Sequence, residues 1–270
     1  MWIFLVVLAL VVTPPPAPAA TTDAFPYASW LRSGRHFLSL DPEHGTAVEV
    51  IGELATASRI AVIVPGVGTT LRDFDRGLGG VTRRAPAMQA RTLYTALHTA
   101  DPGARVAVVA WLGYRPPAGL GPAAIQDVRA RQGAAALTAF VHALPAGADV
   151  TLVGHSYGSV VVGLAAPQLP RVRDLVALGS PGMDVWRADQ LGGARVWAAL
   201  APSDWIHRVP QVKLGHLGLG RRPSTPGFGA SLLPTAGVDG HDGYLSPGSS
   251  TLPAVAQVVL GRLPVPVASS

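Results

Sequence analysis

Residues 149–166 read DVTLVGHSYGSVVVGLAA, and this stretch decides the fold. Residues 149–153 are apolar in the manner of a buried strand, and a helix of small residues is expected from Ser159 onward. Between them lies Gly154-His155-Ser156-Tyr157-Gly158, a G-x-S-x-G pattern. Its place between a strand and a helix predicts a nucleophile elbow with Ser156 at the apex. The alternative is a glycine-rich turn without chemistry.

Each residue type in this turn has a physical reason. A tight strand-to-helix turn forces the serine into an unfavourable backbone conformation, and Gly154 and Gly158 remove Cβ atoms that would collide with neighbouring segments. The start of the following helix directs its dipole and free N–H groups at the site, where negative charge would develop. We interpret His155 as a packing residue rather than a base, because its side chain leaves the turn in another direction from Ser156.

Strand-like and helix-like stretches alternate through the rest of the chain, which favours an α/β fold with a mostly parallel sheet covered on both faces. The first two strands are joined by a tight turn and are expected to form an antiparallel edge. No linker divides residues 21–270, so we expect one domain there. The predicted strands are His36–Leu40, Thr46–Ile51, Arg59–Val64, Arg105–Trp111, Asp149–Val153, Asp174–Leu178 and Arg195–Leu200. The predicted helices are Ala85–Thr99, Ala123–Leu144, Ser159–Ala166 and Pro253–Leu260.

Composition excludes several classes of function. The chain has 270 residues, of which 49% are hydrophobic and 14% charged, enough for a large core. The net charge is +5, but the arginines are scattered and accompany no nucleic-acid-binding motif, so we expect no nucleic-acid partner. The absence of cysteine excludes disulfides, cysteine nucleophiles and thiolate metal sites.

The first twenty residues have the character of a signal peptide. Residues 1–12 are almost wholly apolar yet too short to span a bilayer, and Ala17-Pro18-Ala19 resembles a signal-peptidase site. We expect cleavage near Ala19 or Ala20 and a secreted protein. No Lys or Arg precedes the apolar run, so an uncleaved membrane anchor is the alternative.

Four segments carry a resemblance to a known family. They are IAVIVPGVGTT at 60–70, GHSYG at 154–158, VWAALAPSDWI at 196–206 and GVDGHDGYLSPGS at 237–249. The chain resembles the α/β-hydrolase superfamily and, more narrowly, a family of α/β hydrolases of unknown function from GC-rich Gram-positive bacteria. The resemblance covers roughly residues 36–262 and implies an esterase-like α/β-hydrolase fold but no established substrate. The short connections between the predicted strands indicate that the fold has no large cap domain.

The superfamily order of nucleophile, acid and histidine selects the other site residues. Asp204 follows the strand at Arg195–Leu200 and is our choice for the acid, with Asp184 as runner-up. An N-cap role is the alternative for Asp204. His241 lies in a glycine-flanked loop before the last helix and is preferred to the other histidines as the base, the alternative being an ordinary surface histidine. The remaining candidates after the elbow are Asp174, Asp189, Asp239, Asp242, His207 and His216.

The oxyanion hole needs two N–H donors. One is expected from Tyr157, the residue after the nucleophile. The other is expected from the loop after an earlier strand, where Val67 is our choice and Gly68 the next.

These residues together predict a serine hydrolase that cleaves carboxylic esters through an acyl-enzyme and requires no metal or organic cofactor. An amidase or peptidase with the same triad and a non-catalytic secreted binding protein are the alternatives. The expected partner is a small-molecule ester or lipid, with transient membrane contact left open. Only Ser180–Ala194 separates two consecutive strands, which leaves no room for a long lid and favours short acyl chains.

Overall fold

The computed structural model describes Trp30 and residues 33–263. The predicted signal peptide at residues 1–20 lies outside the described residues. Within those residues, no helix has the length and apolar character needed to cross a membrane.

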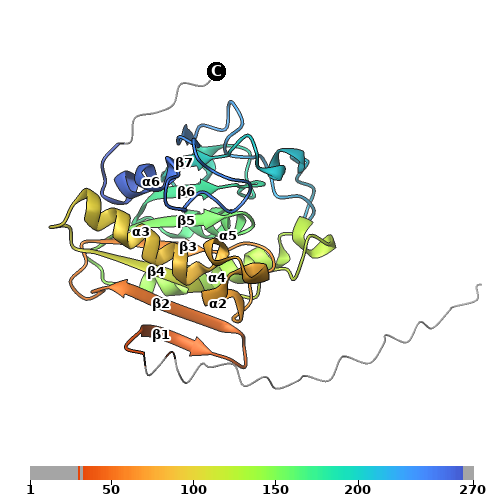
Figure 1. Ribbon diagram of the computed structural model, residues 1–270. Helices are drawn as coiled ribbons and strands as arrows, with labels where there is room; N and C mark the ends of the chain where they lie inside the picture. The colour runs from red at the N-terminus through yellow and green to blue at the C-terminus, as the bar shows by residue number, and fades with distance from the viewer. Residues whose placement is uncertain (1–29, 31–32, 264–270) are drawn as a thin grey trace, which may run out of the picture.

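An eight-stranded sheet forms the centre of the molecule, with strand order β1-β2-β4-β3-β5-β6-β7-β8 (Figure 1). β1 and β2 pair antiparallel, β2 pairs antiparallel with β4, and the remaining pairs are parallel. The predicted antiparallel edge on a parallel sheet is therefore confirmed. The strands are β1 (His36–Asp41), β2 (Thr46–Gly52), β3 (Arg59–Val64), β4 (Val106–Leu112), β5 (Asp149–His155), β6 (Val172–Leu178), β7 (Arg195–Ala199) and β8 (Ser231–Leu232).

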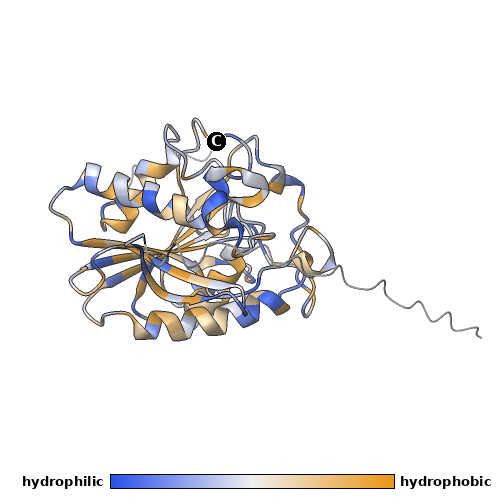
Figure 2. Ribbon diagram, turned by 60° about the horizontal axis from the view of Figure 1, so that its bottom comes forward, coloured by the Kyte–Doolittle hydropathy of each residue, from blue (hydrophilic) through white to orange (hydrophobic). Residues whose placement is uncertain are grey.

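Helices cover both faces of this sheet. They are α2 (Asp73–Arg76), α3 (Pro86–Ala100), α4 (Val128–Ala143), α5 (Gly158–Ala165) and α6 (Thr251–Val259). Alternate residues of each central strand point to opposite faces, so Val62 packs in the core beneath α4 and α5, whereas Ile63 packs in the core beneath α3 and α6. Figure 2 shows the sheet between the two helical layers, with hydrophobic residues along its strands.

The start of one long helix is predicted wrongly from the sequence. The predicted helix Ala123–Leu144 is a 3₁₀ turn at Pro122–Ile125 followed by α4, which begins at Val128. Gln126 adopts extended backbone angles and forms a β-bridge with Leu217, ninety-one positions later. This long-range pairing interrupts the helix, and helical periodicity alone does not reveal it.

The order of the strands positions the site. β5 lies in the middle of the sheet between β3 and β6, so the loops that follow β3, β5 and β7 leave the same edge of the sheet. These three loops carry Val67, Ser156 and Asp204. The parallel sheet therefore brings to one edge residues that are distant in sequence, the outermost being Val67 and Asp204.

Candidate active site

Ser156 stands in a strained turn between β5 and α5. Its φ of 54° is in the left-handed region, which a non-glycine residue rarely adopts. Its amide donates a hydrogen bond to the Leu178 carbonyl of β6 at 2.9 Å, which ties the turn to the neighbouring strand. Strain of this kind persists only where surrounding structure enforces it, and it commonly marks a functional position.

Glycines make the turn possible through close approach of backbone segments. A Cβ on Gly158 would lie 2.1 Å from the Val64 carbonyl oxygen, and a Cβ on Gly154 would lie 2.5 Å from Cα of Ser159. Both distances are far below van der Waals contact. The two glycines of the pattern are therefore required by packing, as expected from the sequence.

His241 and Asp204 form a close pair beside the turn. Nδ1 of His241 lies 2.9 Å from each carboxylate oxygen of Asp204. Asp204 comes from the turn after β7, and His241 comes from the loop that precedes α6. A carboxylate at Nδ1 favours the tautomer with the proton on that nitrogen, which leaves Nε2 free to accept a proton. His241 and Ser156 line the same cavity.

The Asp204 carboxylate is buried and receives several hydrogen bonds. Tyr244 donates its hydroxyl proton to Oδ2 at 2.5 Å, and the Ile206 amide donates to Oδ1 at 2.9 Å. Burial raises the pKa of Asp204, but the hydrogen bond and charge of His241 and the bonds from Tyr244 and Ile206 outweigh it, so the pKa lies below its ordinary value. Asp204 is therefore held as a carboxylate. The bond from Ile206 is also an N-cap bond, so the capping alternative coexists with the contact to His241.

The loop that carries His241 is held from two sides. His155 donates from Nε2 to the His241 carbonyl at 2.8 Å. Arg84 forms an ion pair with Asp242 at 2.6 Å from Nε to Oδ2. Burial, followed by the charge of His241, lowers the pKa of His155, which favours its neutral form. His155 thus contacts the backbone of the histidine loop rather than acting only as a packing residue.

The two residues that the sequence nominates as oxyanion donors adjoin the serine in the chain or in the cavity. Tyr157 directly follows Ser156 at the start of α5, and Val67 follows β3 and lines the cavity. The amide of Gly68, the second choice from sequence, donates to the Pro117 carbonyl at 2.8 Å and is therefore occupied. A Cβ on Gly66 would lie 2.6 Å from Cβ and 3.1 Å from Oγ of Ser156, so the loop passes directly against the serine.

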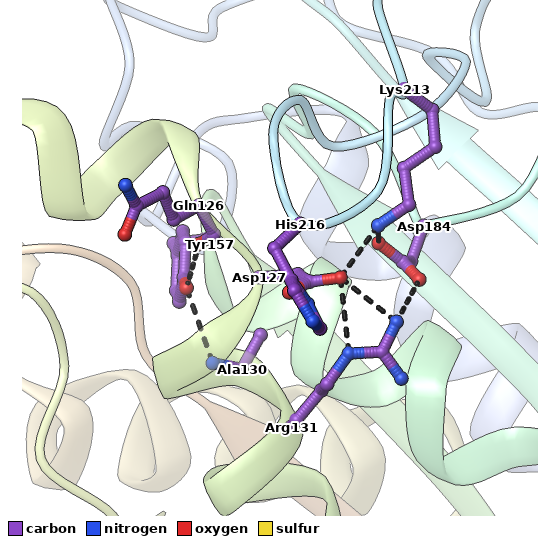
Figure 3. Close-up of polar contacts among 8 residues, drawn as sticks. All are labelled: Gln126, Asp127, Ala130, Arg131, Tyr157, Asp184, Lys213 and His216. Atoms are coloured by element: carbon purple, nitrogen blue, oxygen red, sulfur yellow. Dashed lines mark hydrogen bonds and ion pairs between the residues drawn. The ribbon is translucent and has the colours of Figure 1, made fainter.

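Asp184, the runner-up acid, belongs to another cluster (Figure 3). It forms an ion pair with Lys213, and Arg131 lies 3.4 Å from it. Asp127 is fully buried in the same cluster, with Lys213 at 2.6 Å, Arg131 at 2.8 Å and His216 at 2.8 Å. Burial raises the pKa of Asp127, but these partners outweigh it and hold the pKa well below the ordinary value. Asp184 and His216 thus pair with groups other than His241 and Asp204.

The cluster adjoins the helix that contacts Tyr157. The Tyr157 hydroxyl donates to the Gln126 carbonyl at 2.6 Å and accepts from the Ala130 amide at 3.1 Å (Figure 3). Burial raises the pKa of this hydroxyl to about 12. The side chain of Tyr157 therefore fixes the start of α4 against the turn that carries the serine.

The remaining candidates lie in other contacts. His207 donates from Nε2 to the Ala201 carbonyl at 3.0 Å. Asp174 pairs with Arg195 at 2.8 Å on the strands β6 and β7. Asp239 and Asp189 pair with Arg83 and Arg187, respectively. Among the described residues, no group of three or more His, Asp or Glu side chains is arranged to hold a metal ion.

A cavity of about 260 Å³ lies over the serine. Its lining combines apolar side chains from several loops with a few polar ones. Leu78 and Leu120 are among its apolar lining residues, and they are 39% and 69% exposed. The polar lining residues are Thr69, Arg84, Gln89, Ser156, His155, His241 and Asp242.

Sequence reasoning missed two members of this site. Tyr244 follows His241 by three positions, yet nothing in its local pattern indicates a hydrogen bond to Asp204. Arg84 is distant in sequence and lacks any motif. A search for polar residues within one turn of the histidine could have found Tyr244, but not Arg84.

Comparisons with known proteins agree with the fold. A family model described as alpha/beta hydrolase matches residues 41–214. The uncharacterized protein Rv2079 of Mycobacterium tuberculosis is 32% identical over 251 residues, which cover 81% of this chain and 37% of that protein. The uncharacterized protein Rv0963c of the same organism is 34% identical over 158 residues, covering 56% of this chain and 58% of the relative. The chain thus spans less than two thirds of the length of either relative.

A solved structure shares the architecture. XC6422 from Xanthomonas campestris, described as a member of the a/b serine hydrolases without lid, superposes with a TM-score of 0.50. The identity is 18%, and the match covers 86% of this chain and 97% of the other. This likeness concerns the fold alone. The family model and the mycobacterial relatives confirm the resemblance inferred from the motifs, and the chain belongs to the alpha/beta hydrolase family.

Proposed function

We propose that the protein is a serine hydrolase that cleaves carboxylic esters, with Ser156 as nucleophile, His241 as general base and Asp204 as the acid that orients it. The observation that carries the proposal is the pairing of buried Asp204 with His241, which lines the same cavity as a serine of left-handed backbone. The geometry suits the roles because the buried carboxylate fixes the imidazole tautomer.

The reaction proceeds in two halves. Oγ of Ser156 attacks the ester carbonyl as Nε2 of His241 takes the serine proton, and the carbonyl electron pair moves onto oxygen. The amides of Tyr157 and Val67 donate to this oxyanion. When the carbonyl re-forms, the bond to the alcohol oxygen breaks, and His241 passes its proton to the departing alcohol. Water then repeats these steps on the acyl-enzyme and releases the acid and free Ser156.

A fluorophosphonate tests this proposal directly, because it modifies a serine only where that serine is activated. The protein should bind one equivalent covalently at Ser156, and Ser156→Ala should bind none. Ser58→Ala, which changes a serine at the other end of β3, should label like the unaltered protein. Labelling that persists in Ser156→Ala would refute the assignment of the nucleophile.

The two acid candidates can be separated by matched variants. Asp204→Asn should lower ester turnover by about 10⁴-fold, since it removes the charge that orients the histidine. Asp184→Asn should leave kcat nearly unchanged and act on stability, because Asp184 pairs with Lys213 and Arg131. The reverse result would show that the acid is wrongly assigned.

The size of the cavity supports a preference for short acyl chains. A volume of about 260 Å³ buries little of a long chain, and each CH₂ left in water forgoes about 0.8 kcal/mol. We expect higher kcat/KM for butyryl than for palmitoyl esters and no jump in rate above the micelle concentration. A palmitoyl preference with such a jump would contradict this part of the proposal and indicate a lid within 207–230.

Export is part of the same proposal. The apolar run at residues 1–12 and the Ala17-Pro18-Ala19 site support a cleaved signal peptide and a substrate met outside the cytoplasm. Sequencing the amino terminus of protein recovered from culture medium should give a start near Ala20 or Thr21. A start at Met1 on membrane-bound material would favour the anchor instead.

A further inference from the structure

Two buried polar side chains line the cavity, and each has one polar atom that forms no hydrogen bond within the protein. Thr69 is 8% exposed and Gln89 is 6% exposed. Gln89 donates from Nε2 to the Arg83 carbonyl at 2.9 Å, which leaves Oε1 as its free acceptor. Within residues 33–263, neither Oγ1 of Thr69 nor Oε1 of Gln89 has a hydrogen-bond partner, and neither is among the fully enclosed unpartnered atoms. Both atoms therefore keep accessible surface, which the cavity that they line provides.

Water can hydrate these two atoms in the free protein, but a substrate that displaces this water strands them unless it forms hydrogen bonds with them. Buried polar groups in folded proteins are nearly always paired with protein or with ordered water, because an unpaired one loses its hydration without replacement. Neither residue serves the triad: Thr69 lies on the loop after β3 and Gln89 lies on α3. A substrate group that forms hydrogen bonds with both atoms avoids this loss on binding.

The two atoms together specify the chemistry of that partner. A hydroxyl group of threonine can donate or accept, whereas the Gln89 oxygen can only accept. A substrate that carries hydroxyl groups suits both atoms, since a hydroxyl can donate to the Gln89 oxygen and a hydroxyl can accept from Thr69. An anionic group does not suit the site, because the Gln89 oxygen can only accept a hydrogen bond and would repel it. Arg84, the cation in the cavity lining, is already paired with Asp242 at 2.6 Å and so offers no free positive charge.

The rest of the cavity takes the apolar part of the same molecule. Val67, Leu78, Ala118 and Leu120 line it alongside the polar pair. A small amphiphilic ester therefore fits better than a uniformly apolar one, because the polar atoms would be stranded against a hydrocarbon chain.

We propose that Thr69 and Gln89 form a specificity subsite that selects esters bearing a free hydroxyl group near the scissile bond, an inference that rests on the proposed esterase function. The subsite contacts a hydroxyl on the alcohol portion or on the acyl portion of the ester. Discrimination arises because the analogue without the hydroxyl leaves both protein atoms unpaired in the bound state.

Two matched substrate pairs test the subsite. Glycerol monobutyrate against propyl butyrate places the hydroxyls on the alcohol, and ethyl β-hydroxybutyrate against ethyl butyrate places one on the acyl chain. In at least one pair, kcat/KM should be about tenfold higher for the hydroxylated ester. Thr69→Val should abolish most of this ratio, because it lowers kcat/KM for the hydroxylated ester more than for the deoxy ester. Thr95→Val, the same change on the exposed side of α3, should keep the ratio.

Gln89→Leu is a second variant and should also reduce the ratio. Its fluorophosphonate labelling and that of Thr69→Val report whether the serine remains active. Equal kcat/KM within each pair in a protein that labels at Ser156 would overturn the subsite and leave the esterase proposal standing. An unchanged ratio in both variants would overturn it as well. A protein that neither labels nor turns over any ester would refute the esterase proposal, and the subsite with it.

Discussion

Replacing Tyr244 by phenylalanine removes one hydroxyl from the most buried part of the site. That hydroxyl donates to Oδ2 of Asp204 at 2.5 Å and accepts from the Ala201 amide at 3.1 Å, and the side chain is 1% exposed. A hydrogen bond to a charged group contributes about 2 kcal/mol, and stranding the Ala201 amide costs about 1 kcal/mol more. Tyr244→Phe should therefore lower the free energy of unfolding by about 3 kcal/mol, which is a loss of about 6–12 °C in Tm for a domain of this size.

The same change should act on Asp204 through its pKa. The hydrogen bond from Tyr244 helps to hold the Asp204 pKa below its ordinary value. A carboxylate with a lowered folded-state pKa contributes stability that is full above the unfolded-state pKa and is lost as pH falls through the folded-state pKa. Without the hydroxyl the pKa rises, so the variant has less of this stability to lose. The difference in free energy of unfolding between the unaltered protein and Tyr244→Phe should be greatest above about pH 4 and should become smaller below it.

Chemical denaturation at several pH values measures both effects, and ester kinetics complete the test. We expect kcat to fall about tenfold, the change that about 1.4 kcal/mol of lost transition-state stabilisation produces. Tyr94→Phe is the matched control, since within the described residues the Tyr94 ring makes an edge-to-face contact with His98 and its hydroxyl has no hydrogen-bond partner. An unchanged Tm in Tyr244→Phe, or a difference that is the same at pH 3 and pH 7, would refute the reasoning.

Three further changes probe other parts of the site. Gly66→Ala would place a Cβ 2.6 Å from Cβ of Ser156, so kcat/KM should fall about 100-fold, whereas Gly103→Ala should be silent in the same kinetic assay. Tyr157→Phe removes the bonds to Gln126 and α4, so kcat should fall while KM changes little; a change in KM alone would contradict a role in placing the oxyanion donor. His155 has a lowered pKa, so the unfolded chain binds a proton before the folded one does, and stability falls as pH drops below about 6.5. His155→Gln lacks this titration, so between about pH 7 and pH 5 it should lose less stability than the unaltered protein, as urea denaturation measures. Equal losses in the two proteins would contradict this role of His155.

The fold could be predicted because its signals are local. β3 and β5 are short apolar runs that end at glycine-containing turns, and the strand–turn–helix context of Ser156 is contained in eighteen consecutive residues. The buried middle of a parallel sheet requires such runs. β8 escaped prediction because two residues carry no periodicity.

The contacts of the site could be predicted only in part. Chain order within the superfamily favoured Asp204 and His241, and the structure brings these two together. The hydrogen bond from Tyr244 and the ion pair of Arg84 with Asp242 join separate loops. Such contacts depend on how the loops pack over the sheet, and no local pattern encodes them. The same holds for the break between Pro122 and Val128, which a distant β-bridge enforces.

The most direct measurement is to trap the covalent intermediate. Rapid acid quenching during turnover of a butyryl ester, followed by mass spectrometry of the digested protein, should find one butyryl group on the peptide that contains Ser156. Because His241 activates the serine and later the water, His241→Ala should show no such adduct on the time scale of turnover. Steady hydrolysis of the ester by the unaltered protein with no acylated Ser156, or with the acyl group on another residue, would contradict the proposed mechanism.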